Sequence, residues 1–244
     1  MVKPFLSIII PAYNESIRLP QTLMQVNDFI LSQPYISEVL VVENGSQDQT
    51  FQIAQDFASK IPNFRVLKED GRGKGLAVRR GMLEALGEYR FMCDADLSMP
   101  ISEINCFLPP KLLDYDIAIG SREASGSTRY NEPIYRHLGG RAINTMIRLI
   151  ALPGLQDTQC GFKCFRAGVV EDLFNYQKIM GWSFDIELLY IARKRGYKIE
   201  EVPIHWYFNP ESKLNAVKDA IKMGIDLLEI RRNSRRGLYD RRQE

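Results

Sequence analysis

The chain has 244 residues, of which 45% are hydrophobic and 25% charged, and its formal net charge is +2. This is the composition of a globular protein with a sizeable core, and it gives no global indication of nucleic-acid binding. No apolar run reaches the roughly 18 uninterrupted residues that a spanning helix needs, and the four cysteines lack the spacing of a zinc ribbon. We therefore expect a cytoplasmic protein with reduced thiols, bound at most peripherally to the cytoplasmic face of a membrane.

Apolar, β-rich runs alternate with segments of helical periodicity in the first half of the chain. Strands are predicted over 6–11, 38–44, 64–69, 89–96 and 116–122, and helices over 18–32, 48–60 and 75–86. Strands that are apolar nearly throughout and separated by helices predict an α/β fold, with a mostly parallel sheet covered on both faces. Ligands of such sheets bind at the carboxyl ends of the strands. Polar residues follow four of these strands, at 11–15, 43–46, 94–96 and 120–122.

Beyond residue 125 the pattern loosens. A helix over 134–151, a loop over 154–165, a helix over 184–196, a strand over 199–206 and an amphipathic helix over 213–231 are predicted. Apolar residues recur at helical spacing on one face of the last helix, at Leu214, Val217, Ile221, Ile225 and Leu228. We expect one α/β domain over residues 1–212, followed by the amphipathic helix and a basic tail over 213–244.

The basic tail has six arginines against one acid, Asp240, between Arg231 and Arg242. It is either a solvated C-terminus or a segment attracted to anionic lipid, where each basic side chain contributes on the order of 1 kcal/mol. The apolar stripe before it either packs on the domain or on a second copy of the chain, or lies at a membrane surface.

Asp94 and Asp96 stand one residue apart at the end of the strand predicted over 89–96. On an extended segment their carboxylates point the same way and repel each other unless a cation lies between them and a ligand. Carboxylate oxygens suit Mg²⁺ or Mn²⁺, which also take oxygens from a substrate phosphate. An isolated pair of this kind would more simply begin a turn.

The segment Gly71-Arg72-Gly73-Lys74-Gly75 opens the helix predicted over 75–86. It offers backbone N–H groups, a helix N-terminus and a lysine to a phosphate. The spacing is neither that of a Walker A loop nor that of a dinucleotide-binding GxGxxG. A basic cradle one strand away from a metal site indicates a diphosphate ligand.

Five motifs follow one another along the chain: PAYNE, VxxGSxDxT over 42–50, GKG, DAD and GSR. With them the chain resembles family 2 glycosyltransferases of the GT-A fold. The later DTQCGFK, GWSFDIE and EVPIHW make it similar to dolichyl-phosphate β-glucosyltransferases and related polyprenyl-phosphate glycosyltransferases, over residues 5 to 207. The resemblance implies an inverting, metal-dependent transfer of a hexose, with UDP-glucose as the expected donor and a polyprenyl or dolichyl phosphate as the expected acceptor.

The resemblance also implies a donor site. Asp94 would contact the nucleoside, and Asp96, with Asp94 beside it, would ligate the metal. The residues expected to complete the donor site are Pro11, Ala12, Tyr13, Glu15, Glu43, Asn44, Gly73, Lys74 and Ala95. Family members usually carry Asp-Asp where this chain has Glu43-Asn44, which leaves GDP-mannose open as the donor.

A lipid phosphate is already anionic, so an acceptor of this kind needs cations rather than a base. Arg122, Arg136 and Lys163 are the candidates, with surface salt bridges as the alternative for each. Asp157 would orient the acceptor or, with a soluble hydroxyl acceptor, act as its base. Trp182, Asp185 and Glu187 are candidates to hold the donor sugar, with a place in the core as the alternative.

Two other classes of protein remain. A nucleotidyltransferase also combines an α/β sheet, aspartates and a glycine-rich loop, but that loop would directly follow the first strand, where this chain has PAYNE. A non-catalytic nucleotide-sugar-binding protein would have no need of an intact DAD and GKG.

Overall fold

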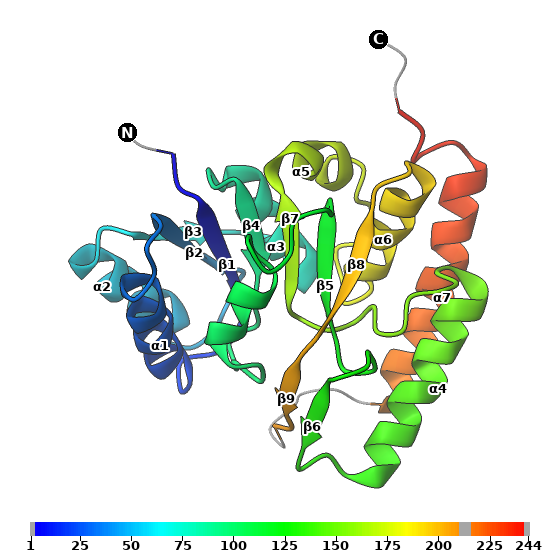
Figure 1. Ribbon diagram of the computed structural model, residues 1–244, viewed down its shortest axis with the longest axis horizontal. Coiled ribbons are helices and arrows are strands. Elements are labelled where there is room, and N and C mark those ends of the chain that lie inside the picture. The colour runs from blue at the N-terminus through cyan, green and yellow to red at the C-terminus, as the bar shows by residue number, and fades with distance from the viewer. Residues whose placement is uncertain (1–2, 210–215, 242–244) are drawn as a thin grey trace.

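A seven-stranded sheet in the order β3-β2-β1-β4-β7-β5-β8 forms the centre of the molecule (Figure 1). The computed structural model describes residues 3–209 and 216–241, with the backbone alone for residues 216–219. Within that part of the chain β7 runs antiparallel to both its neighbours and the other strand pairs are parallel, which confirms the predicted sheet. The strands are β1 (Leu6–Ala12), β2 (Ser37–Glu43), β3 (Phe64–Lys68), β4 (Tyr89–Met92), β5 (Ile117–Ser121), β7 (Lys163–Arg166) and β8 (Ile199–Pro203).

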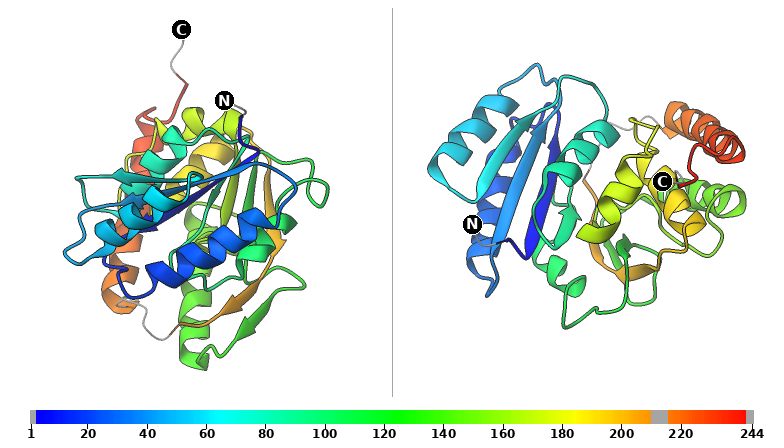
Figure 2. Two further views of the ribbon diagram at one scale, coloured as in Figure 1. Left: turned by 90° about the vertical axis from the view of Figure 1, so that its left-hand side faces the viewer. Right: turned by 90° about the horizontal axis from the view of Figure 1, so that it is seen from above.

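Helices cover both faces of this sheet (Figure 2). One face packs against α1 (Leu19–Leu31), α2 (Thr50–Lys60) and the 3-10 helix η1 (Ile101–Cys106), and the other against α3 (Lys74–Glu84), α5 (Ala167–Phe174) and α6 (Phe184–Lys194). Successive side chains of a strand point to opposite faces, so Ile8 and Ile10 enter the first core and Ile9 the second. All three are fully buried.

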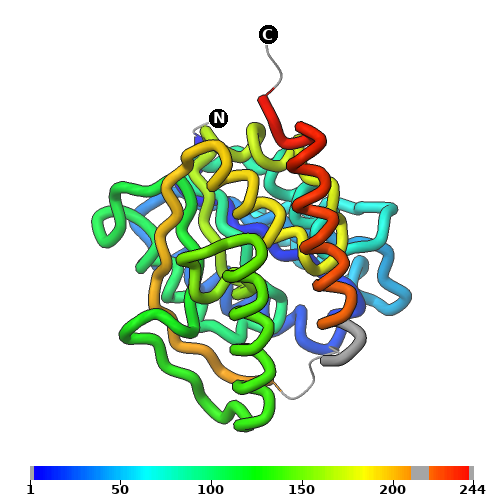
Figure 3. Tube along the Cα trace, turned by 90° about the vertical axis from the view of Figure 1, so that its right-hand side faces the viewer, coloured from blue at the N-terminus to red at the C-terminus, as the bar shows by residue number. Residues whose placement is uncertain are grey.

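Two long helices lie side by side at one end of the sheet (Figures 1 and 3). They are α4 (Ile134–Ile150) and α7 (Ala216–Arg235). A small parallel pair, β6 (Thr128–Tyr130) and β9 (His205–Tyr207), lies near the start of α4 (Figure 1). None of the helices in the described ranges has the length and apolar character needed to cross a bilayer.

Several predicted boundaries differ from the structure. The strand predicted over 89–96 ends at Met92, where pairing with β7 ends. Asp94 follows the strand, and Asp96 lies in the turn after it. The strand predicted over 199–206 is interrupted at Ile204 and continues as β9. The loop predicted over 154–165 contains the start of β7, and β6, α5 and η1 were not predicted.

The described part of the apolar stripe on α7 faces solvent. Ile221, Ile225 and Leu228 are 62%, 60% and 66% exposed, whereas Met223, Leu227 and Ile230 are buried in the core shared with α6. The expectation that this stripe packs on the α/β domain is therefore wrong for these three residues. Leu214 and the side chain of Val217 lie outside the described residues, and so does the boundary predicted between residues 212 and 213.

The basic tail is anchored to the domain. Tyr239 is fully buried, and its hydroxyl donates to Glu187 Oε1 at 2.6 Å. Arg241 forms an ion pair with Asp172 at 3.3 Å. The tail is thus held to the domain by Tyr239 and Arg241, while Arg231, Arg232, Arg235 and Arg236 are exposed, as the interpretation of a solvated segment expects.

Candidate active site

The loop after β1 is braced by the loop after β2 at the carboxyl edge of the sheet. Within the loop after β2, the Ser46 N–H donates to the Glu43 carboxylate and holds that loop in place. Three backbone N–H groups of the first loop donate to side chains of the motif VxxGSxDxT: Asn14 to Ser46 (3.0 Å), Glu15 to Thr50 (2.8 Å) and Ser16 to Asp48 (3.1 Å). The motif therefore has a structural task, which is to hold the PAYNE loop.

The residues expected to line the nucleotide pocket lie together at this edge. Ala12 is fully buried at the end of β1, while the Tyr13 side chain is open to solvent. Pro11 precedes Ala12 on β1, and Tyr13 follows the strand. Glu15 forms an ion pair with Arg18, 2.6 Å between Nε and Oε2.

Glu43 and Asn44 are buried between the loops. The Asn44 amide donates to the Gly73 carbonyl at 3.2 Å, so it links the end of β2 to the glycine-rich loop. Gly73 has φ of 136°, and a Cβ placed there would lie 2.2 Å from the Met180 carbonyl oxygen. A glycine is therefore required where this loop meets the segment before α6.

Lys74 is the first residue of α3 and reaches the aspartate pair. Its Nζ lies 2.5 Å from Asp94 Oδ1 and 5.1 Å from the ring centroid of Trp182. Burial lowers the pKa of Lys74, but the carboxylates of Asp94, Asp185 and Asp96 outweigh this and raise it. The lysine thus offsets part of the repulsion between Asp94 and Asp96.

The aspartate pair suits a metal that a substrate helps to bind. Asp96 Oδ1 accepts the Ser98 N–H at 3.1 Å, and Ala95 between the two aspartates is buried, its carbonyl accepting the Thr22 hydroxyl at 2.6 Å. The described residues hold no group of three or more side chains arranged as a complete metal site. Mg²⁺ commonly takes one or two carboxylates and completes its shell with substrate phosphates and water. Asp94 and Asp96 fit that donor set.

Gly161 packs directly against Asp94. A Cβ at this position would lie 1.9 Å from Asp94 Oδ2 and 2.5 Å from its Cγ. Gly161→Ala should therefore turn the carboxylate away from Lys74 and lower turnover by about 10²-fold, as misplacement of a reacting group by about 1 Å can do. Steady-state kinetics test this, with Gly168→Ala as the control because its Cβ meets no atom within 4 Å. Equal turnover of both variants would contradict the prediction.

Lys163, a predicted acceptor ligand, lies inside the protein. Its side chain is 1% exposed, and its Nζ lies 3.1 Å from Asp185 Oδ2 and donates to the Cys160 carbonyl. The ammonium group is thus taken up by internal partners. Asp185, a candidate to hold the sugar, is buried with it.

Asp157 and Arg122 form a bidentate ion pair. The Arg122 Nε and Nη2 groups donate to the two carboxylate oxygens at 2.6 and 2.8 Å. The backbone N–H of Arg122 donates a third hydrogen bond to the same carboxylate at 3.0 Å. Burial raises the pKa of Asp157, but the charge and hydrogen bonds of Arg122 outweigh it and lower the pKa to about 2. A carboxylate with this pKa is a weak base at neutral pH and a good orienting group.

The remaining candidates divide between the surface and the core. The Arg136 guanidinium lies 4.9 Å from the ring centroid of Phe208. Trp182 is half exposed next to Lys74, and can contact a ligand at this edge. Glu187 is fully buried and accepts the N–H groups of Lys178 and Ile179, so it supports the segment before α6 from within the core.

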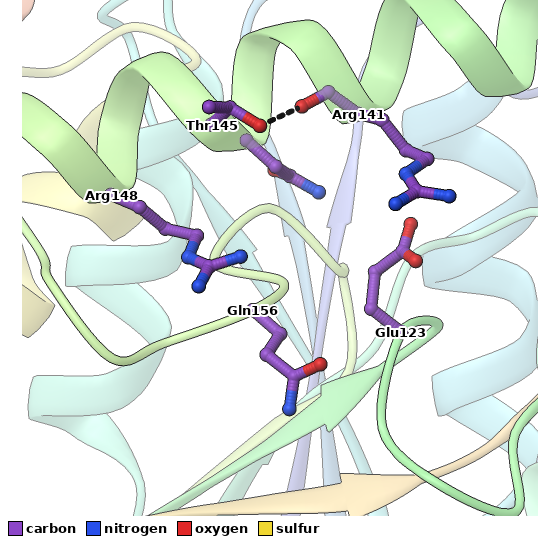
Figure 4. A pocket seen from close by; sticks show the side chains of 6 residues that line it. Glu123, Arg141, Thr145, Arg148 and Gln156 are labelled. Carbon is purple, nitrogen blue, oxygen red and sulfur yellow. Dashed lines mark hydrogen bonds between the residues drawn. The ribbon is translucent and has the colours of Figure 1, made fainter.

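A polar pocket beside α4, which we call the α4 pocket, was not predicted (Figure 4). Its volume is about 100 Å³. A signal was present in the sequence, because Arg141 and Arg148 lie seven residues apart, two turns along one face of the predicted helix, with Asn144 between them. The lining residues are Glu123, Arg141, Asn144, Thr145, Arg148 and Gln156.

The mostly parallel sheet and the loops at its carboxyl edge define a glycosyltransferase of the GT-A type. The chain belongs to glycosyl transferase family 2, whose family model matches residues 7–174. The predicted family and fold are thereby confirmed.

Curated relatives extend this similarity over most of the chain. It is 34% identical over 238 residues to a dolichyl-phosphate beta-glucosyltransferase of Trichomonas vaginalis, a match covering 93% of this chain and 72% of the relative. It is 33% identical over 256 residues to the dolichyl-phosphate beta-glucosyltransferase of Saccharomyces cerevisiae, a match covering 96% of this chain and 76% of that relative. It is 31% identical over 241 residues to the human enzyme (Homo sapiens) of the same name, a match covering 93% of this chain and 74% of that relative.

Solved structures share the fold at low identity. Glucosyl-3-phosphoglycerate synthase from Mycobacterium tuberculosis in complex with UDP matches with a TM-score of 0.66 and 17% identity, over 93% of this chain and 80% of that chain. The complex of this synthase with Mn²⁺, UDP-glucose and phosphoglyceric acid matches with a TM-score of 0.66 and 16% identity, over 93% of this chain and 79% of that chain.

Proposed function

We propose that this protein is an inverting, metal-dependent glycosyltransferase that moves glucose from UDP-glucose to a polyprenyl or dolichyl phosphate. The observation that carries the proposal is the pairing of Lys74 with Asp94, at 2.5 Å, beside Asp96 at the carboxyl edge of the sheet. A cation and two carboxylates there suit a metal-bound diphosphate. The names of the relatives support glucose and a dolichyl phosphate, and the complex of the synthase with Mn²⁺ and UDP-glucose supports the donor and metal.

In the proposed reaction an acceptor phosphate oxygen attacks the anomeric carbon on the face opposite to UDP. The bond from that carbon to the diphosphate breaks, and UDP leaves with the electron pair. Lys74 faces the charge that grows on the leaving diphosphate. A divalent ion held by Asp96 and Asp94 would supply Lewis-acid stabilisation of the same charge when bound. The acceptor needs no base because it is anionic at neutral pH, which agrees with the low pKa of Asp157, about 2.

Turnover of radiolabelled UDP-glucose with and without polyprenyl phosphate tests this function. We expect a glucosyl lipid only when the lipid phosphate is present, and calorimetric affinity for UDP-glucose at least tenfold above that for GDP-mannose. Tighter binding of GDP-mannose would mean that Glu43-Asn44 forms a guanine pocket and would overturn the glucosyl assignment. A soluble acceptor is the second candidate, since the complex of the synthase contains phosphoglyceric acid. Transfer to phosphoglyceric acid but not to the lipid would select it.

We also propose that the solvent-facing side of α7 binds an anionic membrane. Ile221, Ile225 and Leu228 are exposed there, and Arg232 and Arg235 follow on the same side of the helix. A groove of about 580 Å³ beside it is lined by Ile150, Leu228, Arg231, Arg232, Arg235 and Arg236. Four arginines favour anionic lipid over a second copy, whose arginines would meet them with like charge. An apolar stripe that continues into arginines is the arrangement of an interfacial helix.

Liposome co-sedimentation tests the membrane proposal. Binding should rise with the fraction of anionic lipid and fall with salt. The double variant Arg232→Gln/Arg235→Gln should weaken binding by about tenfold or more, because each arginine contributes about 1 kcal/mol near an anionic surface. Lys3→Gln/Lys60→Gln removes the same charge from other exposed positions and is the matched control. Substitution is preferable to truncation because Tyr239 belongs to the core. If both double variants sediment alike, the arginines of α7 have no specific membrane role.

A further inference from the structure

The segment between α5 and α6, residues 175–183, lies directly against the glycine-rich loop, and we call it the α5–α6 loop. A Cβ at Gly73 would lie 2.2 Å from the Met180 carbonyl oxygen, and one at Gly75 would lie 2.9 Å from the Gln177 amide nitrogen. That amide nitrogen donates to the Gly75 carbonyl at 3.0 Å. The two loops are therefore in direct contact, and a displacement of one would displace the other.

Trp182 connects the α5–α6 loop to the candidate active site. Its ring centroid lies 5.1 Å from the Nζ of Lys74, and that Nζ lies 2.5 Å from Asp94 Oδ1. The face of an indole attracts an ammonium group, so the ring helps to keep the lysine in place. Because the indole is half exposed, it can also contact a ligand bound beside Lys74. The position of the α5–α6 loop therefore affects two side chains of the site.

Glu187 holds the first half of the α5–α6 loop, and a residue of the C-terminal tail holds Glu187. The Glu187 Oε2 atom accepts the backbone N–H groups of Lys178 and Ile179 at 2.9 and 2.8 Å. Its Oε1 atom accepts the hydroxyl of the buried Tyr239 at 2.6 Å. The Tyr239 oxygen in turn accepts the amide of Asn233, on α7, at 3.3 Å. The tail thus completes the hydrogen bonds of the carboxylate that fixes the loop.

Asp226 of α7 holds the last residue of the loop. The hydroxyl of Ser183 donates to Asp226 Oδ2 at 2.6 Å, and the two residues are 2% and 8% exposed. A serine directly before a helix usually accepts an N–H group of that helix, but Ser183 makes no such bond in α6. No cation among the described side chains pairs with Asp226, and burial of an unpaired carboxylate costs stability. Both features lower local stability and leave the contact between α6 and α7 as their result.

We infer that Asp226 and Tyr239 are positioning residues of the donor site. The inference rests on the proposed function, because it takes a nucleotide sugar as the ligand at this edge of the sheet. Tyr239 fixes one part of the α5–α6 loop through Glu187, and Asp226 fixes the other through Ser183. The residues between these two attachments include Trp182 and are held against the glycine-rich loop. The buried side of α7 and the tail thereby support the donor site from a distance.

Time-resolved fluorescence anisotropy of the ligand-free protein tests the positioning directly. The chain has two tryptophans, so a Trp206→Phe background leaves Trp182 as the single reporter. In this background Asp226→Leu should about double the anisotropy that Trp182 loses through fast local motion on the ps–ns timescale. Ser183→Ala breaks the same hydrogen bond from the loop side and should give the same result. Asp226→Asn should behave as the background does, because its amide oxygen still accepts the Ser183 hydroxyl. Equal anisotropy decays in all four proteins would overturn the role of Asp226.

Donor affinity and kinetics test the consequence for the site. Asp226→Leu and Tyr239→Phe should each weaken calorimetric binding of UDP-glucose by about tenfold, as expected for loss of one buried hydrogen bond. The KM for UDP-glucose should rise likewise, while the KM for the polyprenyl phosphate stays unchanged. Tyr197→Phe is the matched control, since it removes a tyrosine–carboxylate hydrogen bond of the same 2.6 Å length, to Asp172, outside the loop. It should leave the affinity for UDP-glucose unchanged.

The outcomes separate a positioning role from a merely structural one. If Tyr239→Phe and Tyr197→Phe lower the urea midpoint alike and both retain full affinity for UDP-glucose, Tyr239 only stabilises the fold and the inference is wrong for it. A rise in both KM values together would also contradict a specific effect on the donor site. If the wild-type chain binds no UDP-glucose, the proposed function fails, while the anisotropy of Trp182 in the ligand-free protein still decides whether Asp226 positions the loop.

Discussion

Lys163→Met should lower the free energy of unfolding by about 3–5 kcal/mol, because it leaves the Asp185 carboxylate buried without its cation. The Lys163 and Asp185 side chains are 1% and 7% exposed, and 3.1 Å separates Nζ from Oδ2. Urea denaturation measures the change. A direct acceptor contact would give a different result, namely a raised KM for the lipid phosphate with little loss of stability.

The double variant Lys163→Met/Asp185→Leu is the control for this prediction. It removes both charges, and replacement of a buried ion pair by apolar residues of similar volume is often neutral or stabilising. We therefore expect it to regain most of the stability that the single variant loses. A double variant as unstable as Lys163→Met would mean that the loss comes from packing rather than from an unpaired carboxylate.

The first half of the fold could be predicted because its signals are local. β1, β2 and β3 are apolar runs bounded by polar turns, and the helices between them show clear periodicity. β7 could not be found in this way. It has four residues, KCFR, and is a strand because it pairs with both β4 and β5, which are distant in sequence. The same pairing fixes the end of β4 at Met92, where the apolar run alone gave no stop.

The orientation of α7 shows a second limit of sequence patterns. Ile221, Ile225 and Leu228 recur at intervals of four and three residues, and so do Met223, Leu227 and Ile230 on another side of the helix. Both sets satisfy the helical period, so the sequence does not say which set is buried. Packing against α6 decides in favour of the second set.

The candidate site was predicted in its parts but not in its pairings. The motifs correctly indicated that loops after β1, β2, β4 and β5 meet at one edge of the sheet. The partner of each charge depends on the fold: Asp94 faces Lys74, Asp157 faces Arg122, and Lys163 faces Asp185. The α4 pocket needed the same information, since Glu123 and Gln156 approach Arg141 and Arg148 only in three dimensions.

Asp96→Ala should abolish metal-dependent transfer while leaving the fold intact. The partly exposed side chain belongs to a turn, and its one hydrogen bond in the described part of the chain, from the Ser98 N–H at 3.1 Å, is local. Lewis-acid stabilisation of a leaving group amounts to several kcal/mol, so turnover should fall by about 10³-fold. Asp28→Ala, at an exposed position of α1, is the matched control for loss of a carboxylate.

A measurement besides activity makes the metal assignment decisive. Mn²⁺ titrated into the protein with UDP and followed by electron paramagnetic resonance should bind to the wild-type chain and to Asp28→Ala, but much more weakly to Asp96→Ala. Asp94→Asn should retain part of the metal affinity, because an amide oxygen can still ligate, and should release Lys74 from its ion pair. Full turnover in excess chelator, or equal Mn²⁺ affinity of the wild-type and Asp96→Ala proteins, would refute a metal at this pair. Lys74 would then be the principal cation facing the diphosphate, and Lys74→Met should in that case cause the greatest loss of turnover.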